Sequence, residues 1–236
     1  MARVKEKLYE WIFAALAFSS LVFLIGIVWV LCKESLPIFS RVPLGSFLFG
    51  KFWYPTYCPP EFGILPLILS SVWVTLGAMV VCVPLGVGSA LYLNEVANFR
   101  QRQILKPMIE ILASIPSVVY GFFGVVLVTP FLQKVFSLPT GMTALNASFI
   151  LGLMATPTVC SLAEDALSYV PRSFREASFA VGADRWQTLI KVVIPAAGSG
   201  ISTAIILGMS RAIGETMTVL MVAGGAAVIP KTLLEP

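Results

Sequence analysis

The chain has 236 residues, of which 58% are hydrophobic and 12% are charged, whereas an ordinary soluble domain is about 45–50% apolar and about 25% charged. It contains no histidine, the commonest general base and metal ligand, and its net charge of +4 is too small to indicate a nucleic-acid partner. This composition excludes an ordinary soluble domain. We predict an all-α integral membrane protein, a polytopic helical bundle with no metal site and no catalytic residues.

Five apolar segments predict five transmembrane helices, because about 20 apolar residues cross a bilayer core of about 30 Å. The first is interpreted as a helix and not as a cleaved signal peptide, since it is long and lacks an A-x-A cleavage site. Prolines within the second, third and fourth segments predict kinks. The five segments are residues 11–31, 65–93, 107–131, 146–167 and 196–223.

Two regions are expected along the chain. Residues 1–64 combine the first helix with a proline- and aromatic-rich extracytoplasmic loop, and residues 65–236 form a transmembrane domain. Cys32 and Cys58 both fall near the predicted outer face, so a disulfide between them is left open.

The distribution of lysine and arginine orients the predicted helices. Most basic residues fall in segments that lie inside if the N-terminus is cytoplasmic, as the positive-inside rule requires. This orientation places the short basic loop 94–106 and the longer polar loop 171–195 in the cytoplasm.

The polar loop 171–195 is predicted to form two short helices joined by a corner. Ser173 lies three residues before Glu176, which is the spacing of a capping box at a helix N-terminus. Gly182 is expected to end this first helix, because glycine readily adopts the left-handed conformation of a helix end.

The second helix of the loop is expected to begin at Asp184, which precedes Gln187 by three residues in a weaker form of the same box, and to be limited by Pro195. Trp186 and the aliphatic residues of this helix need an apolar surface to bury them. The helix pair therefore suits either the groove of a soluble partner or the surface of the lipid bilayer.

The residues of this loop resemble the EAA loop of ABC-importer permeases, whose pattern is E-A-A, three residues, G, nine residues and I-x-L-P. Glu176, Gly182 and Pro195 match at this spacing, whereas Ser178 replaces the second alanine, and valine and isoleucine stand at the Ile and Leu positions. In that family the loop is the coupling helix that docks into the ATP-binding subunit. The resemblance implies this coupling role for Glu176, Ala177, Ser178, Gly182, Asp184 and Pro195.

The last apolar segment carries two charges, Arg211 and Glu215, four residues apart and therefore expected on one face of a helix. A lone charge at mid-bilayer costs about 2.5–3.5 kcal/mol on insertion scales, so these two are expected to pair or to face a polar cavity. Two interpretations stay open: a structural salt bridge, or a translocation site in which the planar guanidinium binds an oxyanion. Ser210 and Thr216 are predicted to add neutral hydrogen-bond donors to that pathway.

Two further motifs narrow the resemblance to phosphate importer permeases of the PstC type, namely IPSVVYG at residues 115–121 and RAIGETM at residues 211–217. In that family the Arg and Glu of the second motif are implicated in phosphate passage, and they correspond to Arg211 and Glu215. The resemblance covers roughly residues 65–225 and implies an inner-membrane heterodimer with a related PstA-type permease. It also implies a dimer of ATP-binding subunits that carries ATP and Mg, and an extracytoplasmic phosphate-binding protein. Because such permeases usually have a sixth span, the chain is expected to be incomplete at its C-terminus.

The predicted function is that of a permease subunit that forms a path for inorganic phosphate. The chain has no G-x-x-x-x-G-K-[ST] motif, so it is expected to bind no cofactor itself and to rely on a partner for ATP hydrolysis. Three alternatives remain. They are a permease for sulfate, molybdate or tungstate, an ATP-independent channel or carrier in which Arg211 and Glu215 form a relay, and a non-transporting assembly subunit.

Overall fold

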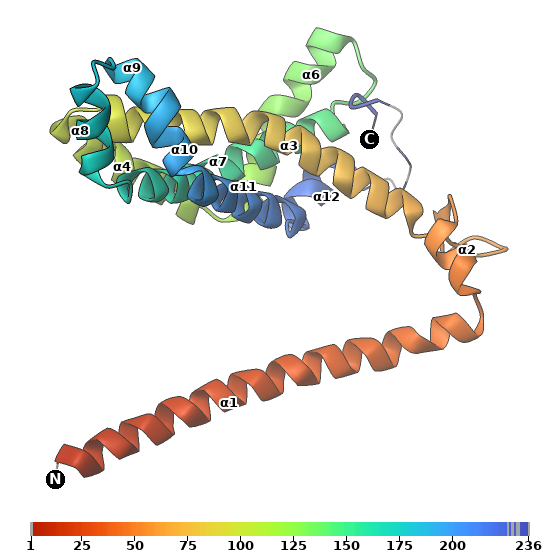
Figure 1. The fold of residues 1–236 in the computed structure, drawn as a ribbon. Helices are drawn as coiled ribbons and strands as arrows, with labels where there is room; N and C mark the ends of the chain where they lie inside the picture. Colours follow the sequence, from red (N-terminus) through yellow and green to blue (C-terminus); the bar gives the residue numbers. More distant parts are fainter. Residues whose placement is uncertain (1, 226, 228, 230–231, 236) are drawn as a thin grey trace. The chain divides into compact units, whose positions relative to one another are not determined.

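The computed structural model describes residues 2–225, 227, 229 and 232–235. Its internal contacts divide the chain into two units, Met1–Ile64 and Leu65–Pro236. Most described residues of both units are helical (Figure 1). Each unit is described by itself.

The first unit consists of one long helix and a small folded segment. Helix α1 (Ala2–Ser35) is apolar around its whole circumference over the stretch that could span a membrane. The segment that follows, predicted as a loop, contains a 3-10 turn, a short helix and a two-stranded ribbon in which Trp53 faces Phe62. Cys32 and Cys58 are both free and exposed, so the disulfide that the sequence left open is not formed. The elements after α1 are η1 (Leu36–Ser40), α2 (Leu44–Phe49), β1 (Trp53–Tyr54) and β2 (Glu61–Phe62).

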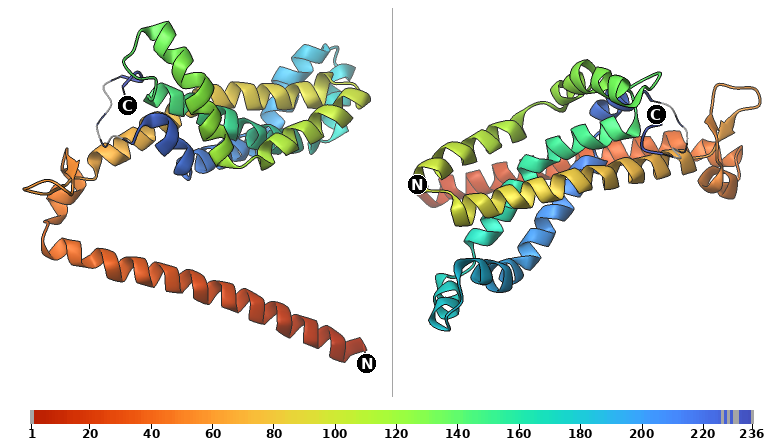
Figure 2. Two further views of the ribbon diagram at one scale, coloured as in Figure 1. Left: turned by 180° about the vertical axis from the view of Figure 1, so that it is seen from behind. Right: turned by 90° about the horizontal axis from the view of Figure 1, so that it is seen from above.

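The second unit is a helical bundle with a helical corner at one end. Figures 1 and 2 show the corner, made by α8 and α9, at the end of this unit that lies opposite α6 and α12. The elements in chain order are α3 (Leu65–Leu91), η2 (Tyr92–Val96), α4 (Phe99–Ser114), α5 (Ser117–Phe123), η3 (Gly124–Val128), α6 (Thr129–Phe136), α7 (Ala144–Ser168), α8 (Arg172–Ala180), α9 (Arg185–Thr188), η4 (Leu189–Val193), α10 (Ile194–Ala196), α11 (Gly198–Ile213) and α12 (Met217–Ala223). Of these, η2, η3 and η4 are π-helical turns.

Helix α7 is the centre of this bundle. Its most apolar stretch is 61% buried, against 28% for the span that contains α3. Small residues permit the close packing: a Cβ atom on Gly86 would lie 2.9 Å from the Val159 side chain, and Gly208 of α11 approaches the same valine. Because interiors are packed to crystal-like density, these glycines fix how closely α3 and α11 approach α7.

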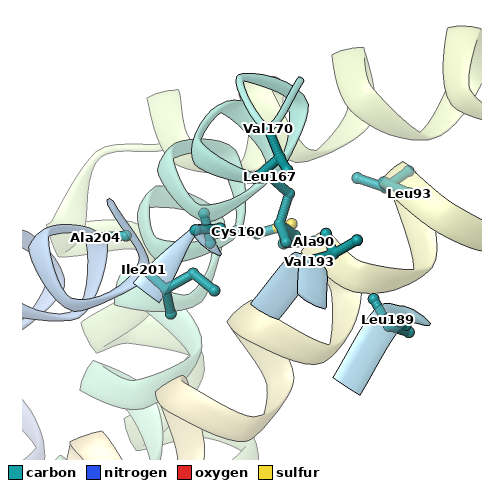
Figure 3. Packing of buried hydrophobic residues seen from close by; sticks show 11 residues of the cluster. Ala90, Leu93, Cys160, Leu167, Val170, Leu189, Val193, Ile201 and Ala204 are labelled. Carbon is teal, nitrogen blue, oxygen red and sulfur yellow. The ribbon is translucent and has the colours of Figure 1, made fainter. Parts of the chain in front are cut away.

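One apolar cluster joins the core of the bundle to the helical corner. It brings together the end of α3, the end of α7 and the turn η4, and Figure 3 shows Leu167 and Val193 close to Ala90 at its centre. All three side chains are fully or almost fully buried. Apolar side chains therefore pack the corner directly against the bundle.

The membrane-spanning segments agree only in part with the prediction of five. Among the described residues, four segments are long and apolar enough to cross a membrane, or five if the bent pair Arg185–Ala196 and Gly198–Ile213 forms one span. Pro84 and Pro157 lie inside continuous helices and end neither of them. The four segments are Tyr9–Ser40, Leu65–Val96, Ser117–Phe136 and Ala144–Ser168.

The predicted third span, residues 107–131, is wrong at its start. Helix α4 begins at Phe99, inside the predicted basic loop 94–106, and ends at Ser114. Pro116 separates it from α5, because proline has no N–H to donate and forces the preceding residue out of the helical region. Ile115 accordingly adopts φ −63° and ψ 130°. The span itself starts at Ser117.

The predicted fifth span, residues 196–223, is broken twice. The chain bends by 67° at the single residue between α10 and α11, and α11 ends at Ile213. Residues 214–216 are not helical, and α12 follows. A glycine at position 214 weakens the helix there, since glycine costs about 1 kcal/mol relative to alanine in a helix interior.

Candidate functional site

The helical corner of residues 171–195 has the predicted form of two short helices, but only one of the two predicted capping boxes. Helix α8 begins directly after Pro171, without a side-chain cap, so the predicted box of Ser173 and Glu176 is wrong. Proline is compatible with a helix start because the first N–H groups have no intrahelical partner. In the second box, the Gln187 N–H donates to Asp184 Oδ1 at 2.7 Å and the Asp184 N–H donates to Gln187 Oε1 at 3.4 Å.

The corner itself is set by one backbone angle and one hydroxyl pair. Gly182 has φ +87°, a left-handed conformation that costs other residues roughly 1–2 kcal/mol, and it ends α8 as predicted. The hydroxyls of Ser178 and Thr188 lie 2.9 Å apart and are buried between the two helices. Ser178, which replaces the second alanine of the EAA pattern, thus fastens α8 to α9.

The outer surface of the corner is apolar and open. Trp186, which was expected to need a partner groove or a lipid surface to bury it, is 68% exposed on this chain, and Val181 is 85% exposed. Pro195 does not end the second helix, which continues to Ala196. Of the six predicted coupling residues, only Ser178 is buried. The other five are exposed, namely Glu176, Ala177, Gly182, Asp184 and Pro195.

Arg175 ties the corner to the end of α3. Its Nη2 donates to Glu95 Oε1 at 2.6 Å and to Asn94 Oδ1 at 3.3 Å, while Nη1 donates to the Val170 carbonyl oxygen at 3.2 Å. The sequence analysis did not identify this pair, because the partners lie 80 residues apart. Charged groups therefore connect α8 with the turn η2 that follows α3.

Glu164 forms a second ionic connection that the sequence analysis missed. Its side chain is 1% exposed, and its two carboxylate oxygens accept from Arg102 and, at 2.6 Å, from Lys106. The hydrogen bond to Glu164 raises the pKa of Lys106, and Asp165 adds to this at 3.3 Å, while partial burial opposes it. The sequence did offer a signal for this contact. It was an acidic residue near the end of an apolar segment, together with two basic residues four positions apart in another segment.

Arg211 is half-buried, and protein groups other than Glu215 hold it. Its Nη1 donates to Thr158 Oγ1 at 3.3 Å, and its Nη2 donates to the Ala113 carbonyl oxygen at 3.2 Å. Its Nε is buried and has no hydrogen-bond partner among the described residues. Ala113 is the penultimate residue of α4, so Arg211 satisfies one of the carbonyls that a helix end leaves unpaired.

The expectation that Arg211 and Glu215 share one helical face is wrong, and the salt bridge between them that the sequence left open is not formed. Because α11 ends at Ile213, Glu215 lies outside the helix, and it makes no ion pair within the part of the chain that the structure describes. Instead, Glu215 and Thr216 line a pocket of about 360 Å³ together with Ser70, Ser71 and Thr75 of α3.

The remaining residue of the predicted pathway, Ser210, is exposed and donates through its hydroxyl to the Ile206 carbonyl oxygen of its own helix at 3.0 Å. Of the four predicted pathway residues, Glu215 and Thr216 therefore line one pocket, whereas Arg211 and Ser210 are not among its lining residues. In the described ranges, no group of three or more Cys, Asp or Glu side chains is placed to hold a metal ion.

Comparison with known proteins identifies relatives of this chain. The profile of the family described as binding-protein-dependent transport system inner membrane component matches residues 82–235. The probable ABC transporter permease protein YqgH of Bacillus subtilis is 42% identical over 187 residues, which are 79% of this chain and 60% of that protein. The phosphate transport system permease protein PstC of Mesorhizobium japonicum is 32% identical over 210 residues, with 81% of this chain and 64% of that protein covered. The chain thus spans less than two thirds of the length of these curated relatives.

Among solved structures, the inward-facing MetNI methionine ABC transporter matches with a TM-score of 0.51 at 24% identity, covering 64% of this chain and 68% of that one. An amino acid ABC transporter matches with a TM-score of 0.50 at 17% identity, covering 69% of this chain and 71% of that one. These likenesses support the fold of the helical bundle.

Proposed function

Because this chain belongs to the family of binding-protein-dependent transport system inner membrane components, whose members are non-catalytic membrane subunits, we propose that it is a permease subunit of an ATP-driven importer and that it forms a pathway for inorganic phosphate. The observation that carries this proposal is Arg211, a guanidinium inside the helical bundle whose buried Nε has no acceptor among the described residues. A planar guanidinium matches an oxyanion in geometry and in charge. The similarity to PstC proteins favours phosphate over other oxyanions.

The divided site gives the two charges different roles. Arg211 recognises the anion, whereas Glu215 lines a separate pocket with hydroxyl side chains. A carboxylate near the route of an anion lowers its affinity by repulsion, which favours passage over trapping. The proposal therefore retains Arg211, Glu215, Ser210 and Thr216 as pathway residues, but not as one cluster on one helical face.

The helical corner is proposed as the docking site for a dimer of ATP-binding subunits that carry ATP and Mg. Its support is an exposed apolar surface around Trp186 on a corner held rigidly by Gly182 and the pair Ser178 and Thr188. Helices that present apolar side chains fit a groove on a partner. The corner lies in the cytoplasm in this proposal, which places the N-terminus there too.

Two further partners complete the proposed complex. A second, PstA-type permease forms the other half of the pathway, and an extracytoplasmic phosphate-binding protein delivers the substrate. The complex is proposed to lie in the inner membrane. The support for these two partners is the family to which this chain belongs and the names of its relatives.

Uptake into vesicles that contain the reconstituted complex tests the function. Arg211→Lys keeps the positive charge but loses the planar fork of donors, and we expect phosphate uptake to fall at least tenfold while the complex still assembles. Arg41→Lys, at an exposed arginine of the first unit, is the matched control and should leave uptake unchanged. Uptake of sulfate, molybdate or tungstate in preference to phosphate would contradict phosphate as the substrate. Unchanged uptake in Arg211→Lys would contradict Arg211 as the anion site.

A further inference from the structure

Helix α4 contacts the bundle through partly buried apolar residues and through polar groups. No residue among its 16 is fully buried, and Leu105 and Ile109 pack against the apolar core cluster as partly buried side chains. Polar contacts add to this packing. Near its first half, Arg102 and Lys106 bind the buried Glu164 of α7.

At the other end of α4, two side chains bind carbonyl oxygens of its last turn. The Tyr120 hydroxyl donates to the Leu112 carbonyl at 2.9 Å, and Arg211 donates to the Ala113 carbonyl at 3.2 Å. Pro116 lies four residues after Leu112 and has no N–H to donate, so the Leu112 carbonyl accepts from the Ile115 N–H at 3.3 Å and from the Tyr120 hydroxyl instead. The C-terminal end of α4 therefore depends on Arg211 for one of its hydrogen bonds.

The same guanidinium has an unused donor. Both terminal nitrogens of Arg211 bind protein acceptors, but Nε is buried and unpaired within the described residues. An unpaired buried donor costs about 1–3 kcal/mol. In a guanidinium, Nε shares one edge with Nη2, so an oxyanion that bound this edge would satisfy Nε and compete with the Ala113 carbonyl for Nη2 at once.

We propose that the Ala113 carbonyl is a resident ligand of Arg211 that a substrate oxyanion displaces from Nη2, so that anion binding releases the C-terminal end of α4. Thr158 then acts as a positioning residue, because its hydroxyl holds Nη1 and orients the guanidinium while the anion binds Nε and Nη2. The Glu164 contacts keep the first half of α4 in place during the exchange. This inference rests on the proposed function, since it takes Arg211 as the group that meets the anion.

Amide hydrogen exchange in the assembled complex, held in lipid nanodiscs without ATP, tests whether an oxyanion displaces the Ala113 carbonyl from Arg211. Inorganic phosphate is titrated, and peptides that cover residues 109–116 and 99–106 are compared. We expect phosphate to speed exchange at the end of α4 by about threefold or more, because helix termini with lost capping contacts fray, and to leave residues 99–106 unchanged.

Two variants make the test specific to Thr158. Thr158→Val removes the hydroxyl acceptor at nearly constant volume, and we expect the phosphate concentration for half-maximal effect to rise about 3- to 10-fold, because the guanidinium loses the hydrogen bond that orients it. Thr158→Ser keeps the hydroxyl and should match the wild type. An unchanged half-maximal concentration in Thr158→Val would overturn the role of Thr158.

The outcomes also separate this inference from the proposed function. If the complex imports phosphate but phosphate never changes exchange at residues 109–116, the inference is wrong and the function stands. If sulfate, and not phosphate, is imported and speeds amide exchange at these residues, displacement of an Arg211 ligand by an oxyanion is supported, and phosphate is the wrong substrate. If no oxyanion is imported or alters exchange, both are wrong.

Discussion

The Lys106 ammonium on α4 donates at 2.6 Å to Glu164 on α7, a carboxylate whose side chain is only 1% exposed. Arg102 binds the other oxygen of the same carboxylate. Since α4 has no fully buried residue, this contact adds to the packing of the partly buried Leu105 and Ile109 in fixing its position. It lies at the end of α7 that leads into the helical corner, so it connects the corner with the helix that reaches Arg211.

Glu164→Gln should destabilise the second unit and loosen α4. The amide keeps the size of the side chain but loses the charge, and hydrogen bonds to charged groups contribute about 1.5–3 kcal/mol. We expect the apparent melting temperature of the purified complex to fall by several degrees. Asp165→Asn is the control, because Asp165 is half-exposed and contacts Lys106 at the longer distance of 3.3 Å. An equal loss in both variants would contradict a special role for Glu164.

The contribution of Lys106 to stability should be independent of pH in the neutral range. The hydrogen bond to Glu164 raises the pKa of Lys106 above its ordinary value of 10.5. A group whose pKa is raised by folding contributes its full stabilisation at pH values below its pKa in the unfolded state. This stabilisation is lost as the pH rises through its pKa in the folded state. The difference in melting temperature between wild type and Lys106→Gln should thus stay constant from about pH 6 to 9 and shrink only above about pH 10.5. A decrease already near pH 8 would contradict this assignment.

Gly182→Ala should distort the helical corner. A Cβ atom at this position has open space around it, so the cost comes only from φ +87°, and is about 1–2 kcal/mol. We expect weaker coupling of ATPase activity to uptake, with membrane insertion unchanged, and a more severe loss in Gly182→Pro, which cannot adopt this angle. Gly198→Ala is the matched control, because its Cβ also meets open space but its backbone is not left-handed. Normal coupling in Gly182→Pro would refute the docking role of the corner.

Trp186→Ala should weaken assembly with the ATP-binding subunit without unfolding the permease. The side chain is 68% exposed, so its removal leaves no cavity, whereas exposed tryptophans at interfaces often contribute 2 kcal/mol or more, roughly a 30-fold change in affinity. The affinity measured by titrating the ATP-binding subunit onto nanodiscs checks this. Trp73→Ala, on α3 and 48% exposed, should leave that affinity unchanged. Equal effects of the two variants would indicate a general loss of stability.

Gly208→Ala should destabilise the contact of α11 with α7. The added Cβ would overlap the Val159 side chain, and overpacking a core costs about 1–3 kcal/mol. We expect a lower melting temperature that a second substitution, Val159→Ala, partly restores. Gly88→Ala, whose Cβ meets nothing within 4 Å, is the control and should be neutral or slightly stabilising. The absence of any rescue would contradict the overlap as the cause.

The sequence alone predicted those features that depend on composition or on neighbouring residues. The membrane class follows from the fraction of apolar residues, and the position of α7 follows from one long apolar run. The corner at Gly182 and the box of Asp184 and Gln187 follow from residues within a few positions of one another, where local backbone energies decide the structure.

The tertiary structure decided which charges meet. Glu164 binds a residue 62 positions earlier, and Arg211 binds the carbonyl of a residue 98 positions earlier, and no local pattern relates such partners. Helical periodicity placed Arg211 and Glu215 on one face, but that argument holds only while a helix continues, and α11 ends between them at Ile213. Which charged groups pair inside a bundle depends on where the helices end and cross. A buried charged group binds the partner that the packing places within hydrogen-bond distance, because leaving it unpaired costs free energy.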